Sequence, residues 1–151
     1  MNKNKNESGQ SLFESVIAIS VVGVALISLV GLTISAIGSA TLAKNQTLAT
    51  KYTQEALEWL RGERDRNWNQ FLSRSTAGGS RYCINILPTG NWNTGTCGSS
   101  ENISDTELYR EVILVRQSAN VVIATVITYW NDNNGIRETR ATTNLTNWKG
   151  R

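Results

Sequence analysis

The sequence predicts an α+β fold in which one long N-terminal α-helix packs on a small antiparallel β-sheet. Between Glu14 and Lys44 no charged residue occurs, and apolar residues continue at helical spacing to about Leu72. Beyond Gly78 and Gly79 the chain changes to short β-rich segments separated by turn residues. An amphipathic helix and a one-sided sheet each need an apolar partner, so we expect them to pack together.

The first half of the helix has the composition of a membrane span. Residues 15–43 would form a helix about 43 Å long at ~1.5 Å per residue, whereas a bilayer core is about 30 Å thick. The excess must tilt, protrude or pack against protein. A secretory signal would have a shorter apolar core and a small-x-small cleavage site after it. We therefore expect a hydrophobic transmembrane helix at 10–43 and a polar domain at 44–151.

The helical pattern continues into the polar domain without a proline. Apolar positions recur at helical spacing: Leu48, Tyr52, Ala56, Trp59 and Leu60, then Trp68, Phe71 and Leu72. Two acid–base pairs stand at i,i+3 spacing: Glu58 with Arg61, and Glu63 with Arg66. The prediction is one helix from about Ser11 to about Leu72, roughly 90 Å long.

The C-terminal half predicts an antiparallel sheet of three or four strands. The strand-like segments are 81–86, 106–116, 120–130 and 136–145. Segment 87–105 is a turn-rich loop with the only proline, and NDNNG at 131–135 predicts a hairpin turn.

Composition argues against several classes of function. The formal net charge of +3 is spread along 151 residues and does not indicate nucleic-acid binding. The chain has no histidine, which is the commonest general base and metal ligand. P-loop, GxGxxG and HExxH motifs are absent. We expect no catalytic residues, no metal and no cofactor.

Cys83 and Cys97 are too few for a typical zinc site in a chain without histidine. One cysteine pair downstream of a membrane segment is typical of a disulfide outside the cytoplasm. It would close a loop of about 15 residues and contribute roughly 3 kcal/mol in the chain-entropy model. Two unpaired thiols are the alternative.

Two further patterns concern packing. Small residues share one helix face at Ser28, Gly31, Ser35 and Gly38, as in helices that approach closely in apolar surroundings, although chance in a Ser/Gly/Ala-rich segment gives the same pattern. The tryptophans suggest either a carbohydrate or ligand surface or a core. We expect Trp59, Trp130 and Trp148 to be buried and Trp92 to be an exposed contact.

The stretch GQSLFE at 9–14, preceded by a short basic leader, resembles the prepilin peptidase site of type IV pilins and pseudopilins. In that family the leader ends in Gly, and Glu stands at the fifth mature position of a hydrophobic helix. The resemblance makes 1–9 the cleaved leader, Gln10 the first mature residue and Glu14 the fifth. The strong resemblance covers about the first 40 residues. More weakly, later segments such as TQEALEWLRGERDRNW look like minor pilins of the PilV and GspI kind.

The resemblance implies a filament subunit and not an enzyme. Its partners would be prepilin peptidase, other pilin subunits, an inner-membrane assembly platform, and the membrane before assembly. Lys3 and Lys5 would keep the leader in the cytoplasm and place domain 44–151 outside it. Glu14 would then pair with the N-terminal amine of a neighbouring subunit. The subunit would pass from the inner membrane to a pilus or a secretion or competence pseudopilus.

This chain departs from the family pattern at two positions. The first mature residue is usually Phe or Met, and here it is Gln10, which leaves N-methylation open. Many major pilins have Pro where this chain has Gly31, so a kink there is not required.

Two alternatives remain. Glu14 is also explained as a juxtamembrane carboxylate that reaches the headgroups without a partner. The whole chain is also explained as a signal-anchored extracytoplasmic enzyme or binding protein that uses the helix as a tether. That class predicts a pocket with convergent polar groups, which the spacing of Glu101, Asp105 and Asp132 does not suggest.

Overall fold

The computed structural model describes residues 7–87, 92–132 and 135–150. The chain divides into two compact units, Met1–Ala43 and Lys44–Arg151. Helix α1, Glu7–Arg66, contributes to both.

In the first unit α1 is a helix whose large apolar side chains are exposed along its length. Its polar side chains bond to the helix itself: the hydroxyls of Ser20, Ser28 and Thr33 donate to the carbonyl four residues earlier at 2.8–2.9 Å. These hydroxyls therefore need no other partner, which suits a helix in apolar surroundings.

The second unit contains one antiparallel sheet in the order β2-β1-β3-β4-β5. Its strands are β1 Ser80–Cys83, β2 Asn93–Thr94, β3 Tyr109–Ser118, β4 Val121–Asp132 and β5 Gly135–Thr146. Gly135, where β5 begins, has φ +116°, a conformation that favours glycine at a hairpin turn. The α+β fold of a long helix packed on an antiparallel sheet is confirmed, with one more strand than expected because β2 lies inside the predicted loop.

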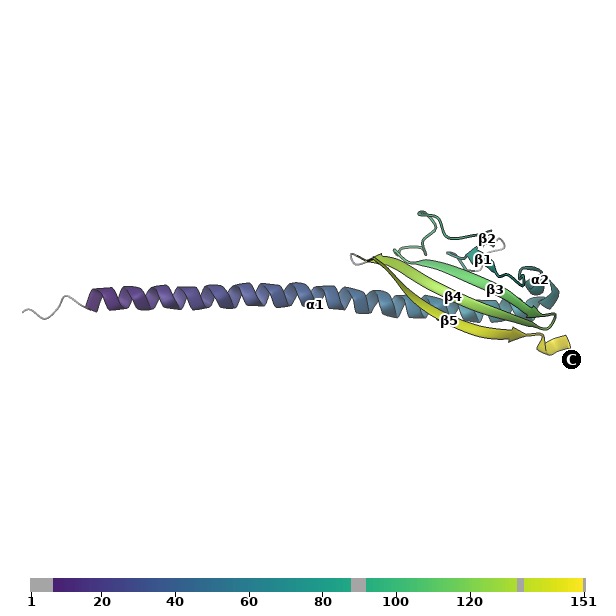
Figure 1. Ribbon diagram of the computed structural model, residues 1–151, viewed down its shortest axis with the longest axis horizontal. Helices are drawn as coiled ribbons and strands as arrows, with labels where there is room; N and C mark the ends of the chain where they lie inside the picture. Colours follow the sequence, from purple (N-terminus) through teal and green to yellow (C-terminus); the bar gives the residue numbers. More distant parts are fainter. Residues whose placement is uncertain (1–6, 88–91, 133–134, 151) are drawn as a thin grey trace, which may run out of the picture. The chain divides into compact units, whose positions relative to one another are not determined.

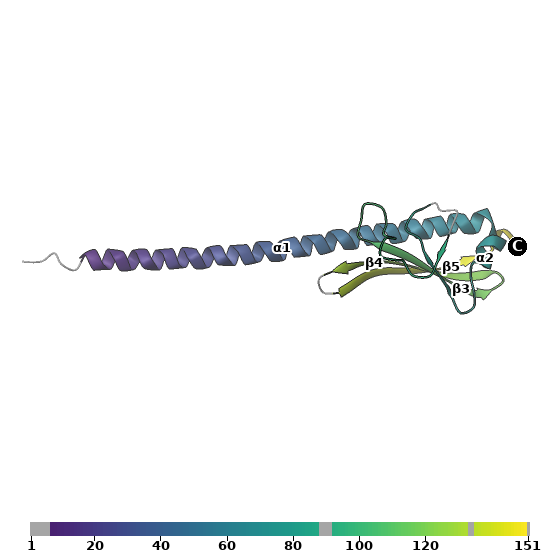
Figure 2. The ribbon, with the colours of Figure 1, turned by 90° about the horizontal axis from the view of Figure 1, so that it is seen from above.

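Residues 44–66 of α1 cover one face of the sheet (Figures 1 and 2). In β4 every second residue from Val122 to Trp130 is buried, as a sheet with one covered face requires. The Thr53 hydroxyl donates to Thr128 at 2.8 Å and ties helix to sheet. The main core consists of Ala56, Leu60, Phe71, Tyr82, Ile84, Val112, Leu114, Val122, Ala124, Val126 and Leu145.

The helix ends earlier than predicted. α1 stops at Arg66, and a short second helix, α2, runs from Trp68 to Ser73. Asn67 separates them with φ −158° and ψ 101°, and its side-chain oxygen accepts the Gln70 N–H at 3.0 Å. Asn is a favoured N-cap residue. The expectation of one helix to about Leu72 is therefore wrong, because the apolar spacing on both sides of Asn67 hides this cap.

Candidate functional site

The predicted processing positions lie at the start of α1. Gly9 and Gln10 belong to its first turns, and residues 1–6 of the predicted leader lie outside the described residues. The first N–H groups of a helix have no partner within it, and helix ends fray.

Glu14 is exposed on α1 among large apolar neighbours that are also exposed, including Leu12, Phe13 and Val16. Among the described residues none forms an ion pair with its carboxylate. A partner for Glu14 must therefore come from the N-terminal segment, from another molecule or from solvent.

Among the residues that the structure describes, one helix, Leu12–Arg66, is long and apolar enough to cross a membrane. None of the side chains in its most apolar window is buried by the protein itself. This segment therefore qualifies as a membrane anchor.

The stripe of small residues is open surface on α1. A Cβ added at Gly31 or at Gly38 would meet no atom within 4 Å, and Ser28 and Ser35 are exposed. The stripe therefore leaves room for close approach by another helix, although nothing in the described chain occupies it.

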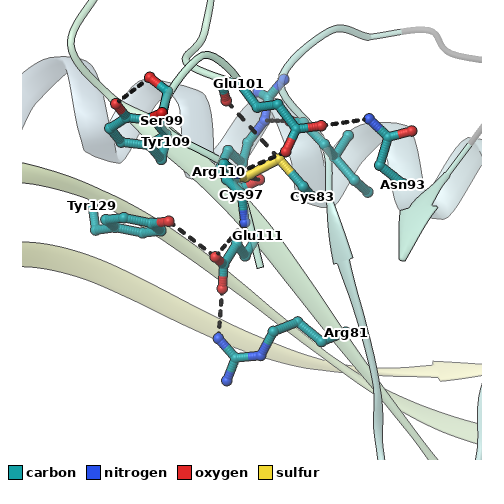
Figure 3. Close-up of a disulfide and its surroundings, with 12 residues drawn as sticks. Arg81, Cys83, Asn93, Cys97, Ser99, Glu101, Tyr109, Arg110, Glu111 and Tyr129 are labelled. Atoms are coloured by element: carbon teal, nitrogen blue, oxygen red, sulfur yellow. Dashed lines mark hydrogen bonds and ion pairs between the residues drawn. A yellow bond between two sulfur atoms is a disulfide. The ribbon is translucent and has the colours of Figure 1, made fainter. Parts of the chain in front are cut away.

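Cys83 and Cys97 form a disulfide, as predicted (Figure 3). Beside it lies the carboxylate of Glu111, which is 2% exposed. Oε1 accepts the Cys97 N–H and the Tyr129 hydroxyl, each at 3.0 Å, and Oε2 accepts the Arg81 guanidinium at 2.5 Å. A buried carboxylate is stable only with such partners, so this cluster fastens the disulfide loop to β3.

Replacing both cysteines by serine should lower the free energy of unfolding by about 3 kcal/mol, because the unfolded chain gains the freedom of the open loop. Urea unfolding of the full chain in detergent micelles measures this change. Thr96→Ser, an exposed change in the same loop, is the control and should be neutral. A double serine variant as stable as the parent would show that the Glu111 contacts alone hold the loop.

The pKa of Tyr129 is raised to about 12 from 10.0, first by burial and then by its hydrogen bond to Glu111. Between pH 10 and pH 12 the unfolded chain loses this proton and the folded chain keeps it. The free energy of unfolding should therefore fall as pH rises through this range. Tyr129→Phe should remove this part of the decline in alkaline unfolding curves. Tyr109→Phe changes the ring stacked on Tyr129, with the two ring centroids 5.3 Å apart, and should retain this decline in stability.

The guanidinium of Arg110 joins the helix to the sheet although the residue is only 1% exposed. Its Nε donates to the Ile84 carbonyl at 2.9 Å, and one terminal nitrogen donates to the Tyr52 carbonyl and to the Glu55 carboxylate, each at 3.1 Å. Burial lowers the pKa of Arg110, and the charge of Glu55 opposes this shift. Arg110 therefore acts as a buried polar clamp between α1 and β3.

Sequence reasoning missed both Arg110 and Glu111. The sequence feature that could have revealed them is two adjacent charged residues inside a β-rich segment. Successive side chains of a strand point to opposite faces of the sheet, so one of the two must face the helix. Each side chain is buried, one under α1 and one under the disulfide loop.

The predictions for the tryptophans are partly wrong. Trp130 is 2% exposed, as expected, and Trp59 is half-buried against the core. Trp148, predicted to be buried, is 56% exposed, because it lies in the 3-10 helix Trp148–Gly150 that follows the end of β5. Its indole N–H donates to Oδ1 of Asp65 at 2.8 Å.

Trp92 is not the exposed contact that was predicted. It is half-buried, its ring centroid lies 4.9 Å from that of Trp59 and 5.1 Å from that of Tyr82, and the Arg74 guanidinium lies 4.5 Å from its centroid. The disulfide brings this part of the loop back onto the core, so the sequence spacing could not show its burial.

A cavity of about 140 Å³ lies where the end of α1 meets the end of β5. It is lined by Arg64, Asp65, Arg66, Trp68 and residues 146–149. Hydrogen bonds from Arg64 and then from Trp148 lower the pKa of the Asp65 carboxyl. The lining thus combines indole rings, three cations and an ionised carboxylate.

Among the described residues no group of three or more His, Cys, Asp or Glu side chains is placed to hold a metal ion. No protein-family model, curated protein or solved structure matches this chain.

Proposed function

We propose that the chain is a structural subunit, a minor pilin or pseudopilin, of a type IV pilus-like filament. Prepilin peptidase would cleave it after Gly9, and it would assemble through its hydrophobic helix. The proposal rests on the exposed apolar surface of α1. Glu14 stands at the start of this surface, directly before the uncharged residues 15–43, and Gly9 lies five residues before Glu14.

The exposed apolar surface of α1 must be shielded from water. Leaving apolar area in water costs about 25 cal/mol per Å², and the large side chains from Leu12 to Leu42 are at least 36% exposed. A bilayer covers this surface before assembly, and a bundle of such helices covers it in a filament. The open stripe at Gly31 and Gly38 favours close helix packing in that bundle.

Glu14 gives a reason for the subunit to move from the bilayer into the helix bundle of the filament. An unpaired carboxylate costs ~3 kcal/mol near the centre of a bilayer and less near its surface. Cleavage after Gly9 creates an α-amine on Gln10. In the filament that amine on one subunit would pair with Glu14 of its neighbour, which sets register more than it adds net stability.

The second unit supports an extracytoplasmic head domain. Its disulfide is typical of compartments outside the reducing cytoplasm. Its interior is filled by the core, the Arg110 clamp and the Glu111 cluster. The partners of the subunit would be prepilin peptidase, other pilins and an inner-membrane assembly platform.

Intact-mass measurement on membrane fractions of the native cells tests the proposal. We expect chains that begin at Gln10, with or without a methyl group on that residue. Finding only chains that begin at Met1 would contradict it and would favour the alternative of a signal-anchored binding protein or enzyme, since a tether needs no cleavage.

A further inference from the structure

Trp148 presents a fixed aromatic face to solvent. Its side chain is 56% exposed, yet its indole N–H is already bonded to Asp65. The Lys149 ammonium lies over this ring, 5.4 Å from its centroid, so the indole offers its opposite face to a ligand. The negative face of an aromatic ring attracts polarised hydrogens, and the C–H groups on one side of a sugar ring are of this kind.

The cavity beside Trp148 has the mixed lining that sugars need. A second indole, that of Trp68, lines it, and its N–H is bonded to the Ala119 carbonyl at 3.0 Å. Asp65 supplies a hydrogen-bond acceptor, and Asn147 supplies both a donor and an acceptor. A small concave site with aromatic walls and a few polar groups is typical of small-ligand recognition.

The charges at the cavity favour an acidic ligand. Arg64 is paired with Asp65, and Arg66 is paired with Glu63. The ammonium of Lys149 donates to the backbone carbonyl of Asp65 at 2.8 Å, and no carboxylate among the described residues forms an ion pair with it. The Lys149 charge also acts on the Asp65 carboxyl and on the Trp148 ring, so a ligand carboxylate would share this charge with them.

We propose that this cavity binds an acidic sugar of the uronate class. The pyranose ring stacks on Trp148, its carboxylate faces Lys149, and its hydroxyls bond to Asp65 and Asn147. A single-stranded nucleic acid fits less well, because the site is one small cavity without the long basic groove that nucleic acids use. The inference does not depend on filament assembly, since every lining residue belongs to the second unit.

Calorimetric titration of the full chain in detergent micelles with hexagalacturonate tests the proposal, with maltohexaose and an oligothymidylate as competing probes. We expect hexagalacturonate to bind at least five-fold more tightly than maltohexaose. Trp148→Ala should weaken this binding at least ten-fold, and Lys149→Gln about three-fold to ten-fold with a smaller dependence on salt. Lys149 is exposed, so its variant keeps the test valid if Trp148→Ala fails to fold.

Matched changes outside the cavity should leave binding unchanged. Ile136→Ala removes an apolar side chain that is 73% exposed on β5, and Arg140→Gln removes an exposed cation from the same strand. Absence of hexagalacturonate binding, or binding that neither cavity variant weakens, would overturn the proposal. Tighter binding of the oligothymidylate would also overturn it and would indicate a nucleic-acid site.

Discussion

Glu14→Ala should be cleaved after Gly9 as efficiently as the parent chain and yet fail to enter filaments. Cleavage depends on the leader and the residues next to the cut, whereas entry depends on a carboxylate that meets a neighbour's new amine. Glu14→Ala leaves the neighbour's amine buried without a partner, and breaking a buried pair in this way costs about 3–5 kcal/mol, so incorporation should fall at least roughly 100-fold. Immunoblots of sheared filament and membrane fractions measure both outcomes.

Two further variants isolate the charge of Glu14. Glu14→Gln keeps the size of the side chain and should fail like Glu14→Ala. Ser20→Ala, which removes only a hydroxyl bonded to the Val16 carbonyl, should assemble normally. If Glu14→Ala assembled normally, the carboxylate would have no role in register, and contact with lipid headgroups would explain its position.

Arg110→Ala should lower the free energy of unfolding of the second unit by about 3–5 kcal/mol. The change removes a fully buried side chain, leaves a cavity, and strips donors from the carbonyls of Ile84 and Tyr52. Thermal and urea unfolding of the full chain in micelles measure the loss.

Arg140→Ala, on strand β5 of the same sheet, is the matched control. Arg140 is exposed and paired with exposed Glu138, so its loss should cost at most about 1 kcal/mol. Arg110→Met, which fills more of the cavity, should be less harmful than Arg110→Ala. Equal effects of Arg110→Ala and Arg140→Ala would show that the clamp contributes nothing beyond an ordinary surface pair.

Periodicity predicted the elements better than it predicted their ends. The helical spacing of α1 and the β-rich character of β3, β4 and β5 are local properties of the sequence, and the structure confirms them. The cap at Asn67 was missed because one side chain decides it against an unbroken apolar pattern. The short strand β2 was missed because its pairing with β1 depends on the disulfide loop.

The sequence-based account of side-chain environments failed where long-range contacts decide them. Trp92 is covered because the disulfide loop folds back, and Trp148 is exposed because the sheet ends before it. Arg110 and Glu111 are buried by elements far away in the sequence. The proposed role of Gly9 and Glu14 does not depend on contacts within one chain. It depends on a new N-terminus made by cleavage and on a second subunit.

The N-terminus of the chain inside filaments shows most directly whether this chain is a processed pilin subunit. Filaments sheared from the native cells should contain this chain, and intact mass should show that it begins at Gln10. Filaments that lack the chain, with Met1 retained on all the membrane-bound protein, would contradict the account.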